Sequence, residues 1–169
     1  MSEFLEKIIA IPFWSKFAES HGFLAMLSLI LFGASLSLYF FSDKIKSALI
    51  WFKVAVTALF VDILLLDMFG LTIYVPYRAE GGPRTLLKAS AENSWLHNIV
   101  FEHKEFLAFA PLILTLIACL IVWKLGDSFS DKGKVYWLRK SVLSALFLSL
   151  VFVLIVAGEA VLVTKTAPL

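Results

Sequence analysis

The stretch LIWFKVAVTALFVDILLLDMFGLTIYV, residues 49–75, decides the fold class of this chain. An apolar helix of about 20 residues crosses the roughly 30 Å hydrocarbon core of a bilayer. Three further runs are similarly apolar, and with their polar first turns the four helices are expected at residues 22–41, 49–75, 98–123 and 139–163. Hydrophobic residues make up 60% of the 169 residues, more than a soluble domain of this length buries. We therefore predict an all-α integral membrane protein, a four-helix up-down bundle in the lipid bilayer.

The first 17 residues are predicted to form a separate amphipathic helix. Their apolar side chains recur at helical spacing, charged side chains occupy another face, and Pro12 breaks or kinks the helix. Such a helix either lies in the membrane interface or packs on a partner subunit, and the sequence favours neither. The remaining residues, 18–169, are expected to form the transmembrane domain.

Acidic side chains interrupt the apolar spans. Asp62 and Asp67 lie inside the second span, and Glu159 lies near the end of the fourth. An ionised carboxyl group at such a depth is costly unless it finds a partner. We therefore expect these side chains to face the bundle interior or a wet cavity, where they bind a ligand, pair within an assembly, or carry protons or ions.

The sequence predicts one long loop, residues 76–93, between the second and third spans. Two prolines and the adjacent Gly81 and Gly82 argue against a continuous helix in this region. Long loops in compact proteins are usually functional or bind partners. We therefore expect this loop to take part in a site or an interface.

The third helix is expected to begin near Ser94, because serine is favoured at helix N-caps. Its first turns carry Glu102 and His103, both of which could point into the bundle. Pro111 follows inside the span and is expected to kink the helix. His97 lies about 120° from the face of His103 at about 100° per residue, and it is predicted to be a surface residue.

An up-down order places both termini and the loop 76–93 on one side of the membrane and the two short linkers on the other. The linkers are predicted to be plain solvated turns. They carry eight of the 15 basic residues over a shorter length: Lys44, Lys46, Lys53, Lys124, Lys132, Lys134, Arg139 and Lys140. Because cytoplasmic loops are enriched in Lys and Arg, we predict an inner or plasma membrane protein with the termini and the long loop outside the cytoplasm.

The same topology brings polar residues from all four helices to one end. His21 opens the first helix, Asp67 lies toward the end of the second, His103 opens the third, and Glu159 nears the end of the fourth. Two imidazoles from different helices at matched depth can ligate haem iron from opposite faces, as in membrane b-type cytochromes built as helix bundles. We therefore predict a haem b held by His21 and His103.

In this interpretation Arg78 and Arg84 of the loop bind the haem propionates. A transition metal ion such as iron, copper or zinc is the alternative, because mixed imidazole and carboxylate ligands suit these metals. The candidate metal ligands are His21, Asp67, Glu102, His103 and Glu159. Cys119 is the only cysteine, which excludes a thiolate-rich site, and the Glu-x-x-His pairs of di-iron bundles are absent.

Three functions fit these features. The first is a membrane subunit of a redox or respiratory complex that takes part in electron transport. The second is a non-catalytic accessory or structural subunit of a larger membrane protein complex, and the third is a proton or ion pathway. The Walker, Rossmann, His-Glu-x-x-His and Gly-x-Ser-x-Gly motifs are missing, which argues against a self-sufficient hydrolase or nucleotide-using enzyme. No basic patch interleaved with aromatic residues suggests nucleic acid as a partner.

Overall fold

The computed structural model describes residues 12–131 and 133–166, and within these ranges it contains helices and turns but no β-strand. In chain order the elements are α2 (Phe13–Phe41), α3 (Lys46–Arg78), α4 (Pro83–Ala89), the π-helical turns η1 (Leu96–Phe101), α5 (Glu102–Leu125), the 3-10 turn η2 (Gly126–Ser130) and α6 (Tyr136–Thr166). Over the described ranges, four helical segments are long and apolar enough to cross a membrane: α2, α3, α5 with its flanking turns, and α6. This confirms the predicted all-α class and the four membrane-length helices.

The N-terminal boundary differs from the prediction. Residues 1–11 lie outside the described residues, so for them the amphipathic helix stays a prediction. Pro12 directly precedes α2, and residues 13–17 form the first turns of that helix. A proline fits just before a helix because the first backbone N–H groups have no partner inside the helix. The first long helix therefore begins at Phe13 instead of residue 22.

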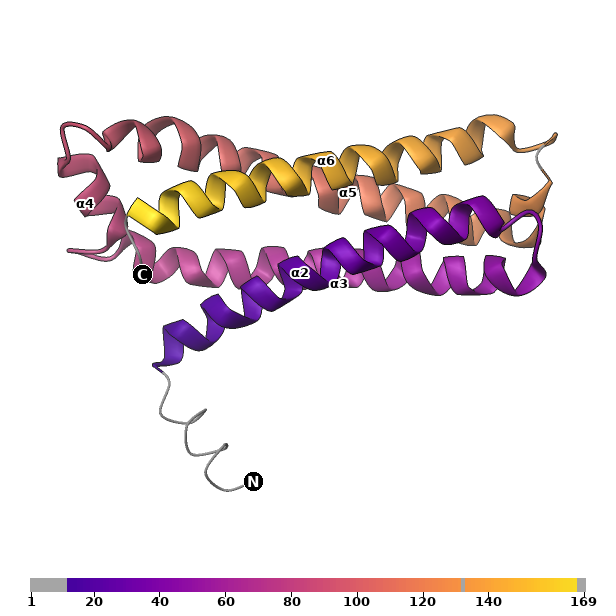
Figure 1. Cartoon of the computed structure of the whole chain (residues 1–169), viewed down its shortest axis with the longest axis horizontal. Coiled ribbons are helices and arrows are strands. Elements are labelled where there is room, and N and C mark those ends of the chain that lie inside the picture. The colour runs from indigo at the N-terminus through magenta and orange to yellow at the C-terminus, as the bar shows by residue number, and fades with distance from the viewer. Residues whose placement is uncertain (1–11, 132, 167–169) are drawn as a thin grey trace, which may run out of the picture.

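Figure 1 shows the four long helices side by side, each running opposite to the next. α2 packs mainly on α3 and α5 mainly on α6, while α3 also contacts α5 and α2 also contacts α6. These contacts close a ring in which α2 and α5 occupy opposite corners. We call the end with α4, the start of α2 and the end of α6 the α4 end, and the opposite end the linker end. α2 crosses the bundle obliquely, so its first turns lie apart from α5 and α6 (Figure 1).

The bundle encloses a narrow core and turns many large apolar side chains outward. Phe32, Phe52, Leu59 and Leu146 are completely enclosed between the helices. By contrast, Phe106 on α5 is 81% exposed, and similar side chains cover the outer faces of all four long helices. A water-soluble monomer rarely exposes so much contiguous apolar surface, whereas lipid chains solvate it. The outer surface therefore agrees with the membrane setting expected from the composition.

The linker end is held together by a buried arginine, so the prediction of plain solvated linkers was wrong there. Arg139 at the start of α6 is only 5% exposed. Its guanidinium donates to the Phe129 carbonyl over 2.5 Å and to Ser42 Oγ over 3.4 Å, and it lies 3.8 Å from an Asp43 carboxylate oxygen. It also lies over the aromatic rings of Tyr39 and Phe129. One side chain thus joins both linkers, because the planar guanidinium offers five donors in a fixed geometry.

The predicted long loop 76–93 is largely helical instead. α3 continues through Pro76 to Arg78, and α4 occupies residues 83–89. Pro76 is tolerated because it removes a single backbone donor close to the helix end. Gly81 has a positive φ of 73°, and a Cβ on Gly82 would lie 2.6 Å from the Pro76 carbonyl oxygen. The two glycines therefore permit the tight turn that folds α4 back onto α3.

Alanine at position 82 should destabilise the protein by about 1–3 kcal/mol, because its Cβ would overlap a backbone carbonyl that cannot move alone. Gly33, in the middle of α2, has no atom within 4 Å of its ideal Cβ position and provides the control. Gly33→Ala should be neutral, or stabilising by up to about 1 kcal/mol. Thermal unfolding of both variants in detergent tests this pair. Equal melting temperatures would contradict the role given to Gly82.

Candidate functional site

His21 lies on α2 near the α4 end and packs against α3. Its Nδ1 is 3.0 Å from the carbonyl oxygen of Leu66. A carbonyl only accepts hydrogen bonds, so Nδ1 carries the proton, and Nε2 of the neutral ring keeps its lone pair. Gly70 makes this position possible, because a Cβ there would lie 3.2 Å from Cε1 of the imidazole. The half-buried ring is thus fixed with Nε2 as its only free nitrogen for a ligand.

His103 lies in the first turn of α5, and its Nδ1, like that of His21, has an acceptor on a neighbouring helix, here an acid on α6. Its Nδ1 lies 2.6 Å from Oε1 of Glu159. The carboxylate accepts the Nδ1 proton, which leaves Nε2 free. The side chain of His103 is 54% exposed, whereas that of Glu159 is 17% exposed. The other carboxylate oxygen of Glu159 is buried and has no hydrogen-bond partner among the described residues.

Lys104, which the sequence analysis did not single out, belongs to the same end. It is half-buried on α5, and its ammonium lies 4.7 Å from the centre of the Phe101 ring. It interacts electrostatically with the carboxylates of Glu105 and Glu159 and with the imidazole of His21. A positive charge therefore lies within electrostatic range of groups on both α2 and α6.

The other predicted metal ligands do not assemble with the two histidines into a metal site. Asp67 is half-buried, and its Oδ2 is enclosed and has no hydrogen-bond partner in the part of the chain that the structure describes. Glu102 is exposed. Over residues 12–131 and 133–166, no group of three or more His, Cys, Asp or Glu side chains is placed to hold a metal ion. Of the predicted ligands, the structure pairs only His103 with Glu159 by a direct hydrogen bond.

His97 is 2% exposed, so the prediction that it is a surface residue was wrong. Arg84 Nε donates to His97 Nε2 over 3.4 Å, which places the ring proton on Nδ1. That proton then points to the hydroxyl oxygen of Tyr77, 2.9 Å away. α4 covers the histidine and supplies Arg84, which a structureless loop would not have done. Both ring nitrogens are used, so His97 is a structural residue and no ligand.

Stacked aromatic rings complete this corner of the bundle. The Tyr77 and Phe101 rings stack at 4.0 Å with an interplanar angle of 8°, and Tyr74 stacks on Phe101 at 5.8 Å. Arg78, the other predicted propionate partner, is exposed, and its guanidinium lies 4.3 Å from the centre of the Tyr74 ring. Tyr74 also donates to Glu105 over 3.3 Å. This cluster joins α3 to η1 and α5, directly beside Lys104.

Tyr77→Phe should lower the free energy of unfolding by about 1–3 kcal/mol, because the buried Nδ1–H of His97 loses its acceptor while the ring stack remains. Tyr136→Phe removes a hydroxyl from an exposed ring and should change stability by less than about 0.5 kcal/mol. Denaturant titration in mixed micelles measures both. A Tyr77→Phe variant as stable as Tyr136→Phe would exclude the hydrogen bond.

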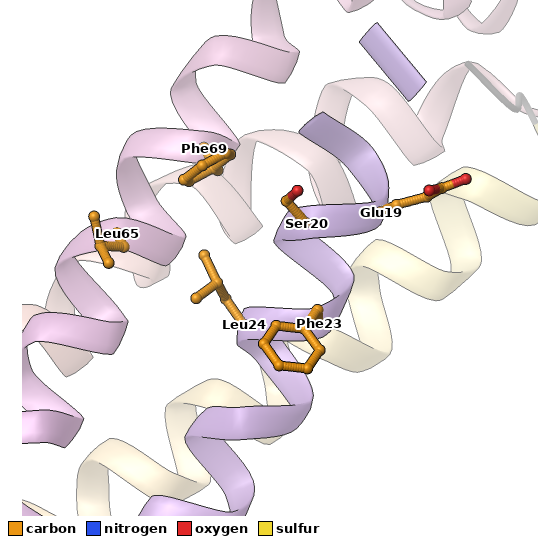
Figure 2. A pocket seen from close by; sticks show the side chains of 6 residues that line it. All are labelled: Glu19, Ser20, Phe23, Leu24, Leu65 and Phe69. Atoms are coloured by element: carbon orange, nitrogen blue, oxygen red, sulfur yellow. The ribbon is translucent and has the colours of Figure 1, made fainter. Parts of the chain in front are cut away.

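An apolar pocket of about 360 Å³ lies between α2 and α3, in the half of the molecule nearer the α4 end. Figure 2 shows that one wall comes from Leu65 and Phe69 of α3 and the other from residues of α2. The α2 wall is formed by Glu19, Ser20, Phe23 and Leu24. His21 does not line this pocket, which is therefore separate from the histidine cluster.

The fold and its polar α4 end define a class: an all-helical protein with four membrane-length helices and two imidazoles presented with free Nε2 atoms at one end. No family model matches the chain, and no similar curated protein or solved structure was found.

Proposed function

We propose that this chain is an integral membrane subunit of a redox or respiratory complex and that it binds a haem b at the α4 end through His21 and His103. One observation carries the proposal: each imidazole gives its Nδ1 proton to an acceptor, Leu66 O or Glu159 Oε1, and keeps Nε2 free. Iron-ligating and zinc-ligating histidines are commonly oriented in this way by a carbonyl or a carboxylate.

A haem fits this arrangement better than a transition metal ion bound by side chains alone. A porphyrin supplies four ligands of the iron, so the protein has to supply only two. A bare ion needs three or more protein ligands in contact, and the described residues offer no such group. His21 on α2 and His103 on α5 would supply these two ligands from different helices at the same end of the bundle.

The surrounding charges suit the carboxylates of a haem. The ammonium of Lys104 is within electrostatic range of His21 and Glu159, and Arg78 presents an exposed guanidinium at the same end. Arg84 is committed to His97, so of the two predicted propionate partners Arg78 is the better placed. A bound haem would supply one-electron chemistry; Glu159 would keep the His103 ring in the ligating tautomer, and Lys104 would offset the propionate charge.

We place the protein in an inner or plasma membrane with the α4 end outside the cytoplasm. The linker end carries eight basic residues on the two short linkers and the helix turns that flank them, and the positive-inside rule assigns such an end to the cytoplasm. Cysteine introduced at exposed Glu80 or Lys134 should react with an impermeant maleimide in intact cells only at position 80. Labelling at position 134 alone would reverse the orientation.

Haem titration of the isolated subunit tests the proposal. Purified in mild detergent without partners, the chain should bind haem to saturation at one per chain, followed by the Soret band. Parallel titrations with Zn²⁺, Cu²⁺ and Fe²⁺ should give no comparably tight one-to-one binding. Saturable binding of a metal ion but not of haem would move the site to the metal alternative. If neither haem nor a metal ion binds, the redox proposal is wrong.

A second candidate function, a non-catalytic subunit of a larger membrane complex, is favoured by the pocket between α2 and α3. It opens on the outer surface and is lined by the exposed Phe23, and two further aromatic side chains, Phe13 and Trp14, are exposed in the first turn of the same helix. A partner helix could place a side chain there. Replacing pocket residue Leu65 by Trp should then release the partner in a mild-detergent pull-down without changing haem content. Retention of every partner would remove the argument for this candidate.

A further inference from the structure

Four buried polar side chains, one from each long helix, lie in the middle part of the bundle. These residues are Ser28, Asp62, Thr115 and Ser149, and none is more than 3% exposed. We call them the polar layer. Ser35, about two turns further along α2, is also buried, and its hydroxyl has no hydrogen-bond partner among the described residues.

Contacts on either side of the layer show that Ser28, Asp62 and Thr115 lie at about the same level. On α2 and α3, His21 contacts Leu66 and Tyr39 contacts Phe52. Ser28 lies between His21 and Tyr39 on α2, and Asp62 lies between Phe52 and Leu66 on α3. The two residues are therefore at about the same height along the bundle. On α3 and α5, Thr57 contacts Cys119 and Tyr74 contacts Glu105. Asp62 lies between Thr57 and Tyr74 on α3, and Thr115 lies between Glu105 and Cys119 on α5, so these two residues are also at about the same height. These heights agree to within about one helical turn of 5.4 Å.

Thr115 and Ser149 are linked through a shared acceptor. Both hydroxyl groups donate to the carbonyl oxygen of Pro111, over 2.8 Å and 3.5 Å. Pro111 thus marks the level at which α5 and α6 contribute to the layer. As predicted from the sequence, the proline lies inside the third span, where it cannot donate a backbone hydrogen bond.

The layer contains acceptors but no free donor. The hydroxyl protons of Ser28, Thr115 and Ser149 all go to backbone carbonyls. Both carboxylate oxygens of Asp62 are buried and have no hydrogen-bond partner among the described residues. Such an arrangement is unfavourable unless a positive charge joins it, because a carboxylate among acceptors gains no compensating interaction.

We propose that the polar layer binds one small monovalent cation, a Na⁺ ion or a proton, on Asp62. The oxygen-only lining excludes metals that prefer nitrogen or sulfur ligands. A single carboxylate matches a single positive charge, and the hydroxyl oxygens of Ser28 and Thr115 keep lone pairs for a Na⁺ ion or for a proton carried by Asp62. This proposal does not depend on a haem at the α4 end.

The buried polar groups of the layer on α2, α5 and α6 are hydroxyls. The next titratable or charged side chains toward the α4 end are His21 on α2, Asp67 on α3, Lys104 and Glu105 on α5, and Glu159 on α6; toward the linker end they are Tyr39 on α2, Lys53 on α3, Cys119 on α5 and Lys140 on α6. A spectral change that comes from the polar layer must therefore disappear when Asp62 alone is replaced and these other groups are kept. Asp62→Asn provides that comparison.

Infrared difference spectroscopy of the full chain in liposomes tests the proposal. In the Na⁺ case, replacing choline by Na⁺ at neutral pH shifts a carboxylate band in the wild type and in the exposed control Asp127→Asn, but not in Asp62→Asn. In the proton case, Na⁺ has no effect, and a protonated-carboxyl band is present at neutral pH, is lost at alkaline pH, and is missing from Asp62→Asn.

Thr115→Val supplies a second variant, which removes one oxygen and keeps the shape. In the Na⁺ case it should raise the Na⁺ concentration for half-maximal change by about tenfold or more, as expected for one lost contact to a charged group. In the proton case it should shift the frequency of the carboxyl band. The proposal is overturned if, at neutral pH, no protonated-carboxyl band is lost in Asp62→Asn and Na⁺ leaves the carboxylate bands unchanged.

Discussion

His103→Ala and His21→Ala should each abolish stoichiometric haem binding by the isolated subunit. Each substitution removes an imidazole whose Nε2 is free because its Nδ1 donates to a specific acceptor. The acceptor is Glu159 Oε1 for His103 and Leu66 O for His21. A haem b with one remaining axial ligand should bind at least about 100-fold more weakly. Soret titration in detergent measures the loss, and both variants should remain folded because neither ring belongs to the buried core.

Glu159→Gln is the matched variant for this pair. The amide oxygen can still accept the Nδ1 proton of His103, so haem should still bind, with affinity reduced by about tenfold. The carboxylate makes the imidazole more electron-donating, which favours ferric iron, so its removal should raise the reduction potential. Full haem binding by His21→Ala or His103→Ala would show that other residues are the ligands.

Arg139→Ala should destabilise the bundle by about 3–5 kcal/mol, the largest effect on stability that we expect for a single residue. The substitution removes the donor to the Phe129 carbonyl and the charge beside Asp43, and it removes the guanidinium that packs over the Tyr39 and Phe129 rings. Unfolding by SDS in mixed micelles measures the difference. Haem binding at the other end should change little under native conditions.

Two variants interpret the Arg139 result. Arg139→Lys keeps the charge but loses the planar set of donors, so its stability should fall between those of Arg139→Ala and the wild type. Lys140→Ala removes the neighbouring exposed cation and should stay within about 0.5 kcal/mol of the wild type. Wild-type stability of Arg139→Ala would mean that packing alone holds the linker end.

The fold class could be predicted from the sequence because four long apolar runs leave few alternatives. Up-down topology also places His103 and Glu159 at one end, and the structure shows them in contact. The burial of Asp62 inside the bundle could also be predicted from the sequence, because a carboxyl group in the middle of a span turns away from lipid.

The contacts of His97 and Lys104 could not be predicted. His97 is buried because Gly81 and Gly82 let α4 fold back over it. A stretch of loop-forming residues in the sequence does not show that the chain folds back in this way. The π-helical turns of η1 change the angle per residue, so helical counting at 100° misplaces the side chains that follow them. The electrostatic interactions of Lys104 with Glu159 and His21 therefore have no signal in the sequence.

The reduced-minus-oxidised visible spectrum of the isolated subunit, purified in mild detergent after expression with sufficient haem, tests the central claim most directly. If His21 and His103 ligate a haem b through Nε2, the spectrum shows a Soret shift with sharp α and β bands, as for low-spin iron with two imidazole ligands. A featureless spectrum from a folded, monodisperse preparation, with no haem in its acid extract, would contradict the claim and favour the non-catalytic subunit.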